Sequence, residues 1–111
     1  MIVAGGRYFQ PTSDSVAALD LISSVYPIME VVSGGARGAD AFGESWARRR
    51  GLTVKQFPAE WHKHGNAAGP IRNEQMAKYA VGGVAVLFPG GSGTASMRGF
   101  AVANGLIVID L

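Results

Sequence analysis

The stretch from Ser33 to Asp40 carries residue types that suit the binding of an anion. It reads Ser-Gly-Gly-Ala-Arg-Gly-Ala-Asp, follows the short run Glu-Val-Val at 30–32, and precedes a segment with helical spacing. Glycines let backbone N–H groups approach a ligand closely, and a helix N-terminus adds unpaired donors and a partial positive charge. The planar guanidinium of Arg37 can bind a phosphate through two hydrogen bonds. The alternative is a tight turn with Arg37 as a solvated surface charge.

A second glycine-rich stretch, Pro-Gly-Gly-Ser-Gly-Thr at 89–94, has the same setting. It follows the unbroken apolar run 84–88 and opens another segment with helical spacing. An apolar run bounded by turns is typical of a parallel strand that is buried on both faces. Two such loops at one edge of a sheet are hard to explain by turn formation alone. We therefore expect a bound ligand that contains phosphate, either a nucleotide or a nucleotide derivative.

The elements that position these loops alternate along the chain. The sequence predicts strands at 2–4, 29–33, 53–57, 84–88 and 106–109. Helices are expected from residue 12 or 13 to 26, near 38 to 50, 71 to 79 and 94 to 104, with an irregular stretch at 58–70. This alternation predicts a single α/β domain over residues 1–111, with helices on both faces of a five-stranded parallel sheet in the order 3-2-1-4-5.

All loops that follow the strands of a parallel sheet meet at one edge. We therefore expect one crevice there, with two arginines, Arg37 and Arg72, clamping one anion between the two glycine loops. The residues expected to bind the ligand or its phosphate are Gly5, Gly6, Arg7, Ser33, Gly34, Gly35, Arg37, Gly38, Asp40, Arg72, Asn73, Gly90, Gly91, Ser92, Gly93 and Thr94.

Several of these side chains have structural alternatives. Arg72 and Asn73, placed at the start of the third helix, would contact phosphate and base or ribose, or form a surface pair. Ser33 and Thr94 could bind phosphate oxygens or cap their helices. Asp40 is close enough to its loop to meet a ribose hydroxyl.

Glu44 and Trp61 lie near the predicted crevice without being assigned to phosphate. Glu44 lies four residues before Arg48, and this spacing fits an exposed row of ion pairs on a helix. Trp61 is expected to be a lid or core aromatic, with stacking on a base as the alternative.

Composition excludes several classes of protein. The chain has 111 residues, 48% hydrophobic and 16% charged, which indicates a globular domain. It has no cysteine, hence no disulfide or thiolate site, and no apolar run near the ~18 residues that span a membrane. The first residues read as a strand, not a signal peptide, so a cytoplasmic location is expected. A small sheet leaves helix faces exposed, and we expect a homodimer or higher oligomer.

Neither a metal nor a nucleic acid is the expected partner. The net charge is +2, and the only basic run, Arg48 to Arg50, ends a helix, where cations interact favourably with the helix dipole. His62 and His64 lack a third ligand in register, so no metal site is expected. No cofactor beyond the bound ligand is required.

Four stretches read together resemble the SLOG superfamily, specifically its YspA and cpYpsA-related branch. They are 33–40, Phe-Pro-Ala-Glu-Trp at 57–61, Ala-Gly-Pro-Ile-Arg-Asn at 68–73 with Met76, and Ser-Gly-Thr at 92–94. The resemblance implies a compact Rossmann-like domain that binds nucleotides or nucleotide-derived ligands. More distantly, it extends to the LOG-type phosphoribohydrolases and to the DNA-processing protein DprA.

The LOG-type pattern pairs an arginine before the fourth strand with Pro-Gly-Gly-x-Gly-Thr-x-x-Glu. Arg72 and residues 89–94 match it, but Met97 stands at the glutamate position, and a thioether supplies no acid–base chemistry. Glu60 and Val81 also replace aspartates of the family pattern. We therefore favour binding or sensing of a nucleotide derivative, and expect hydrolysis of nucleoside monophosphates to be absent or very weak. A DNA-associated role is the third alternative.

Overall fold

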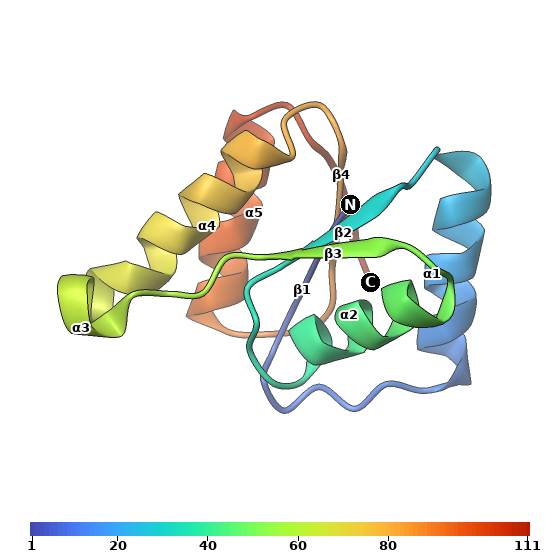
Figure 1. Ribbon diagram of the computed structural model, residues 1–111, viewed down its shortest axis with the longest axis horizontal. Coiled ribbons are helices and arrows are strands. Elements are labelled where there is room, and N and C mark those ends of the chain that lie inside the picture. The colour runs from blue at the N-terminus through green and yellow to red at the C-terminus, as the bar shows by residue number, and fades with distance from the viewer.

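The computed structural model describes all 111 residues as a parallel sheet with helices on both faces (Figure 1). The strands are β1 (Ile2–Ala4), β2 (Glu30–Ser33), β3 (Thr53–Gln56), β4 (Val84–Leu87) and β5 (Ile107–Asp110). The helices are α1 (Ser13–Val25), α2 (Ala39–Arg49), α3 (Trp61–His64), the 3-10 turn η1 (Gly65–Ala67), α4 (Ala68–Tyr79) and α5 (Ser92–Ala103).

The sheet has the order β3-β2-β1-β4-β5 with every neighbouring pair parallel, which confirms the predicted topology. Strand β1 lies at the centre, where Ile2 pairs with Val32 of β2 and with Ala85 of β4. All four residues of β4 are buried, as the apolar run predicts. Predicted strand boundaries differ from the observed ones by one residue at several ends.

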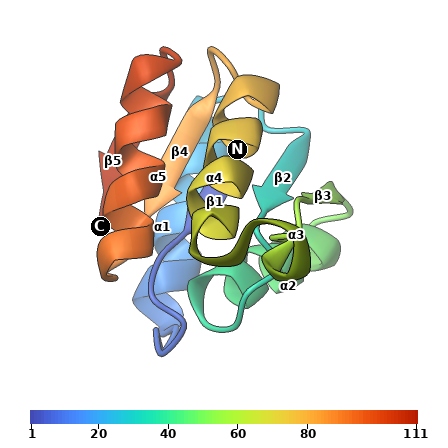
Figure 2. The same ribbon diagram turned by 90° about the vertical axis from the view of Figure 1, so that its left-hand side faces the viewer.

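Two hydrophobic clusters fill the space between the sheet and its helices. Helices α1 and α2 cover one face, and α4 and α5 lie side by side on the other (Figures 1 and 2). Successive strand residues point to opposite faces, so Val3 packs with the α1 and α2 side, while Ile2 and Ala4 pack with the α4 and α5 side. The central strands are therefore held from both sides, and their C-terminal ends form a rigid edge.

The segment between β3 and β4 differs from the prediction. Residues 58–70 were expected to be irregular, but α3 and η1 form within them, and α4 begins at Ala68 instead of residue 71. Pro70 is tolerated because it occupies the first turn of α4, where the backbone N–H has no intrahelical partner to lose. As a result, Arg72 and Asn73 lie in the second turn of the helix and not at its N-terminus.

Candidate functional site

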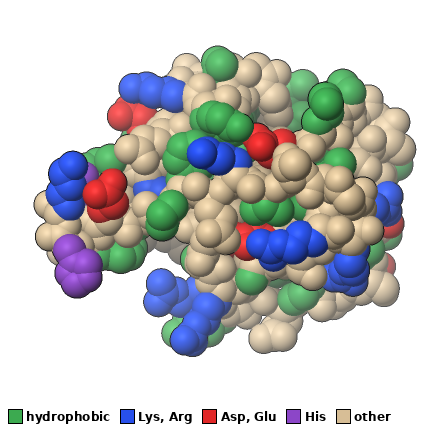
Figure 3. Space-filling model, viewed as in Figure 1, with side chains coloured by type: hydrophobic (Ala, Val, Ile, Leu, Met, Phe, Trp, Pro, Cys, Tyr) green, Lys and Arg blue, Asp and Glu red, His purple; other side chains and the backbone are tan.

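A cleft of about 570 Å³ lies at the C-terminal edge of the sheet. Its lining combines the loop after β1, the loop after β2, the segment from α3 into α4, and the first turns of α5. Figure 3 shows the surface hollowed below the protruding lobe formed by α3. Segments that are far apart in the sequence therefore meet in one concave site.

The N-terminus of α5 offers unused donors to this cleft. The helix begins after Gly91, and the backbone N–H groups of Ser92, Gly93 and Thr94 donate to no acceptor in the protein. All three residues line the cleft, and the hydroxyl of Thr94 makes no hydrogen bond within the protein. Free N–H groups at a helix N-terminus, together with the helix dipole, favour a bound anion.

Three glycines allow the loops at this edge to pack backbone against backbone. The N–H of Gly6 donates to the carbonyl of Pro89 at 2.9 Å, and the carbonyl of Gly6 accepts from the N–H of Ala39 at 3.2 Å. A Cβ at Gly38 would lie 2.6 Å from the backbone carbon of Arg7, and one at Gly90 would lie 2.7 Å from the nitrogen of Gly6. These glycines position the loops and do not themselves need to touch a ligand.

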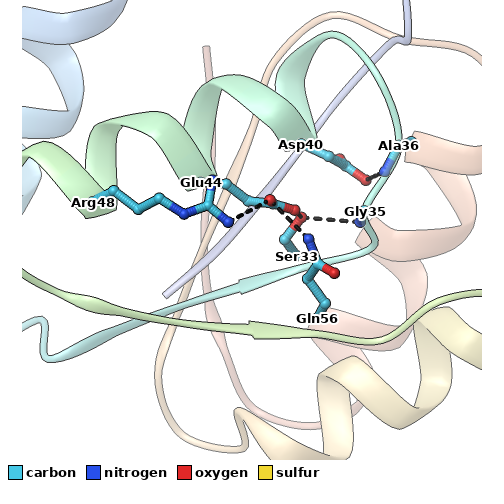
Figure 4. A network of polar contacts seen from close by, with 7 residues as sticks. All are labelled: Ser33, Gly35, Ala36, Asp40, Glu44, Arg48 and Gln56. Atoms are coloured by element: carbon cyan, nitrogen blue, oxygen red, sulfur yellow. Dashed lines mark hydrogen bonds and ion pairs between the residues drawn. The ribbon is translucent and has the colours of Figure 1, made fainter.

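A buried polar network supports the loop after β2 (Figure 4). The hydroxyl of Ser33 donates to Glu44 at 2.6 Å and accepts from the N–H of Gly35 at 3.0 Å. Glu44 also accepts from Gln56 at 2.8 Å and from Arg48 at 3.2 Å.

The prediction that Glu44 belongs to an exposed row is therefore wrong, since only 6% of Glu44 is exposed. Its pairing with Arg48 is present, but two further donors, from β2 and β3, draw the carboxylate inward. The helical spacing could not reveal these donors because they come from other elements. Ser33 is fully buried, and its hydroxyl is committed to this network.

Asp40 is the one acidic residue in the lining of the cleft. It is 7% exposed, and its Oδ2 accepts a hydrogen bond from the N–H of Ala36 at 3.2 Å. Burial raises the pKa of this carboxyl; the N–H of Ala36 and the charge of Arg72 oppose the rise, and the charge of Glu44 adds to it. The loop after β2 thus holds an acidic group of its own at the N-terminus of α2.

Arg72 and Asn73 connect the two glycine loops. One guanidinium nitrogen of Arg72 donates to the carbonyl of Gly34 at 2.8 Å, and Nε donates to the side-chain oxygen of Asn73 at 3.0 Å. The amide nitrogen of Asn73 in turn donates to the carbonyl of Gly93 at 3.2 Å. Desolvation lowers the pKa of Arg72, and the charge of Asp40 partly offsets this effect. The two side chains therefore form a hydrogen-bonded bridge across the cleft.

The structure brings most, but not all, of the predicted site residues together. Those in the lining are Gly5, Gly6, Arg7, Gly34, Asp40, Arg72, Asn73, Gly91, Ser92, Gly93, Thr94 and Trp61. Outside the lining lie Ser33, Gly35, Arg37, Gly38 and Gly90. Arg37 is exposed, so Arg7 and Arg72 are the two arginines that the structure brings to the cleft.

Eight residues that were not predicted complete the lining, most of them in the α3–α4 segment and α5, with Ala4 at the end of β1 and Ala36 in the loop after β2. They are Ala4, Ala36, Asn66, Gly69, Pro70, Met76, Ser96 and Met97. The Asn-Ala-Ala-Gly-Pro sequence at 66–70 could have indicated this part of the lining, because glycine and proline also form the turns of the other loops.

Trp61 occupies the outer rim of the cleft. It is 55% exposed at the start of α3, and a Cβ at Gly69 would lie 3.6 Å from its ring. Helix α3 projects from the body of the molecule, away from the sheet (Figure 1). Trp61 is therefore not a core residue, in contrast to Trp46 of α2, which is 3% exposed.

The structure has neither a cluster of metal-ligating side chains nor a helix that could span a membrane. No group of three or more His, Cys, Asp or Glu side chains is placed so that it could hold a metal ion. None of the helices is both long enough and apolar enough to cross a lipid bilayer.

A parallel sheet with a cleft at the C-terminal ends of its strands defines a Rossmann-like ligand-binding architecture. Residues 1–64 match the family model of the YspA, cpYpsA-related SLOG family. The Gene 61 protein of Mycobacterium phage D29 is 35% identical over 96 residues, which cover 80% of this chain and 75% of that protein. The chain therefore belongs to the YspA, cpYpsA-related SLOG family, as the resemblance of its motifs predicts. No solved structure matches it.

Proposed function

We propose that this protein binds a nucleotide, or a phosphorylated molecule derived from one, in the cleft at the C-terminal edge of its sheet. The observation that carries the proposal is the set of three unused N–H groups at the start of α5, which belong to residues that all line the cleft. Such a set suits the oxygens of a phosphate. Membership of a SLOG family supports a nucleotide-related function in the broad sense.

The residues that line the cleft indicate how a ligand would be oriented in it. The phosphate would lie on Ser92, Gly93 and Thr94, with Arg7 at the same cleft as a cationic partner. The remainder of the ligand would extend toward α3 and α4, where Trp61 and Pro70 offer apolar surface and Asn66 offers an amide. A planar base suits this end, because an exposed indole can stack on it.

The proposal is for binding or sensing, and not for hydrolysis of the ligand. Met97, at the position of the LOG-type glutamate, is 1% exposed and contributes a thioether to the lining. Neither Glu60 nor Glu74 lines the cleft, and the one carboxylate that does, Asp40, belongs to the first turn of α2 and not to α5, where the LOG-type glutamate would lie. Cleavage of an N-glycosidic bond needs a carboxylate beside the oxocarbenium-like transition state.

A nucleic-acid partner is not proposed. In the basic run, Arg48 pairs with Glu44, Arg50 pairs with Asp20, and Arg49 donates to Ser45. The Lys and Arg side chains visible in Figure 3 are spread over that face and form no continuous patch. A phosphate backbone would need clustered, unpaired cations.

The experiment has two parts. Small molecules retained by the purified protein are identified by mass spectrometry, and a panel of nucleoside 5′-monophosphates is titrated by calorimetry. We expect a phosphorylated ligand in the first part and saturable binding in the second. The proposal is overturned if nothing is retained and no member of the panel binds.

A matched pair of variants locates the binding. A Cβ added at Gly91 or at Gly99 meets no atom within 4 Å, so Gly91→Val and Gly99→Val should both fold. Gly91 precedes the free N–H groups in the cleft, whereas Gly99 lies two turns along α5 and outside the lining. We expect Gly91→Val to weaken nucleotide binding by about tenfold or more through obstruction of the N–H groups, and Gly99→Val to leave it unchanged. Equal binding by both variants would place the site elsewhere.

A further inference from the structure

The loop after β2 differs from the N-terminus of α5 because three of its backbone N–H groups are already bound within the protein. The N–H of Gly35 is bound by Ser33 Oγ, that of Ala36 by Asp40 Oδ2, and that of Ala39 by the carbonyl of Gly6. The position where a helix N-terminus would receive an anion from a ligand thus holds a carboxylate of the protein itself. A ligand phosphate has no free backbone donor to gain there from these three groups.

The carboxylate of Asp40 is nevertheless directed to the cleft. The residue is more than nine-tenths buried, yet it lines the cleft, and only its Oδ2 is used by a protein donor. No fully buried side-chain oxygen or nitrogen lacks a partner, so the free Oδ1 must reach the cleft surface. An oxygen of this kind accepts a hydrogen bond from a hydroxyl and repels a second anion.

The surroundings of Asp40 keep it in this position. A Cβ at Gly34 would lie 2.9 Å from Asp40 Oδ2 and 2.8 Å from the central guanidinium carbon of Arg72, so the three groups pack tightly. Arg72 itself is held by the carbonyl of Gly34 and by Asn73. Arg72 can therefore balance the charge of Asp40, but it is not free to swing toward a second phosphate without breaking two hydrogen bonds.

We propose that Asp40 is a specificity-determining residue, which limits the cleft to ligands with a single anionic end at α5 and a hydroxyl group at the loop after β2. This inference rests on the proposed function and names the ligand class within it. Nucleoside 5′-monophosphates with free ribose hydroxyls fit the rule. Nucleotides that carry a further phosphate on the ribose do not, because that phosphate would face the carboxylate.

The test removes the negative charge of Asp40 and keeps the shape of its side chain. In Asp40→Asn the side-chain oxygen can still accept from the N–H of Ala36, so the loop should keep its conformation; Asp40→Ser is the second variant if Asn disturbs folding. Asp14→Asn is the matched control. Asp14 is the second residue of α1, as Asp40 is of α2, but it is exposed and lies outside the cleft.

The first measurement uses inorganic phosphate and backbone amide spectra by NMR. In the wild type we expect phosphate to shift the amides of residues 92–94 and to leave that of Ala36 unchanged. In Asp40→Asn the N–H of Ala36 stays bound to the side chain, but the repulsion is removed, so phosphate can come close enough for its charge to shift the amides of the loop after β2. In Asp14→Asn the wild-type pattern should remain. A phosphate response at Ala36 in the wild type, or none in either Asp40 variant, would overturn the inference.

The second measurement compares adenosine 5′-monophosphate with adenosine 3′,5′-bisphosphate. We expect the wild type to prefer the monophosphate, and Asp40→Asn to reduce that preference by about tenfold or more, because a like charge is removed. An unchanged ratio overturns the inference. A third outcome is that neither nucleotide binds, while phosphate shifts the amides of both loops as described above. In that case the proposed function fails, but the exclusion of a second anion by Asp40 stands.

Discussion

The two glycine-rich loops at the C-terminal edge of the sheet have similar sequences but differ in whether their backbone N–H groups are already bound within the protein. Both follow a buried strand, both open a helix and both contain three glycines. The loop at 33–40 is closed in the sense that the N–H groups of Gly35, Ala36 and Ala39 are bound by Ser33, Asp40 and Gly6. The loop at 89–94 is open, with three N–H groups that bind nothing in the protein. Glycine content alone therefore does not determine whether a helix N-terminus is available to a ligand.

What separates the loops is the first turn of the helix that follows each. Helix α2 places an aspartate at its second position, and its first N–H points at a backbone carbonyl of the neighbouring loop. Helix α5 begins with Ser-Gly-Thr and has no acidic residue in its first turn. A side chain that can accept hydrogen bonds near a helix N-terminus competes with any ligand for the same donors.

The largest expected effect is a loss of stability from a substitution that disrupts the loop at 33–40. Gly38 and Gly51 flank α2 with nearly equal positive φ values, 71° and 70°, but a Cβ at Gly38 overlaps the backbone of the loop after β1, while one at Gly51 meets nothing within 4 Å. We expect Gly51→Ala to cost about 1–2 kcal/mol of unfolding free energy from conformation alone. Gly38→Ala should cost clearly more or abolish folding, as measured by urea denaturation. Equal costs would mean that the contact between the loops adds no stability.

A smaller effect sharpens the difference in ligand binding. Arg7 lines the cleft, whereas Arg37 of the closed loop is exposed outside it. A charge-assisted hydrogen bond to phosphate contributes about 1.5–3 kcal/mol, so Arg7→Ala should weaken nucleotide binding by about tenfold or more. Arg37→Ala should change it little, although the sequence pattern favoured Arg37. Calorimetric titration of both variants decides between them, and a larger loss in Arg37→Ala would show that the closed loop opens to bind.

The smallest effect concerns the pH dependence of stability. The pKa of Asp40 is raised in the folded state, so between its ordinary and its raised value the folded protein binds the proton more readily than the unfolded chain. The contribution of this carboxyl to stability is thus present at low pH and is lost as the pH rises through the raised pKa. Asp40→Asn should therefore gain stability relative to the wild type as the pH rises from the ordinary pKa of an aspartate, 3.8, through the raised pKa of Asp40. A difference that is constant across this range, in paired urea titrations, would contradict the expectation.

The fold could be predicted because its signals are local. The apolar run at 84–88, the glycine turns and the capping residues each identify an element, and right-handed crossovers then leave few arrangements of five parallel strands. The same reasoning found the edge where the cleft lies. It also found the family, because four short motifs in order are more specific than any one of them.

The details of the site depend on contacts between distant segments and could not be predicted in this way. The inward turn of Glu44 needs Ser33 and Gln56 as donors, and neither is its neighbour on α2. Arg7, Arg37 and Arg72 were all expected at the cleft, but Arg37 lies outside it, and the sequence of its loop does not show which way its side chain points. Sequence patterns in the loops therefore identify the edge of the sheet where the cleft lies, but not which polar groups at that edge are already hydrogen-bonded within the protein.

The central position of β1 has a consequence for the order of events in folding. Ile2 pairs with Val32 on one side and with Ala85 on the other, so the middle of the sheet joins the first residues of the chain to a strand made near its end. Contacts between residues so distant in sequence form slowly, because a long loop must close before they bring any gain. A growing chain cannot complete its central strand until β4 has been synthesised, and the open helix N-terminus follows β4 directly. The ligand cleft therefore cannot form before β4 and the first turns of α5 have been made, since its lining extends to Met97.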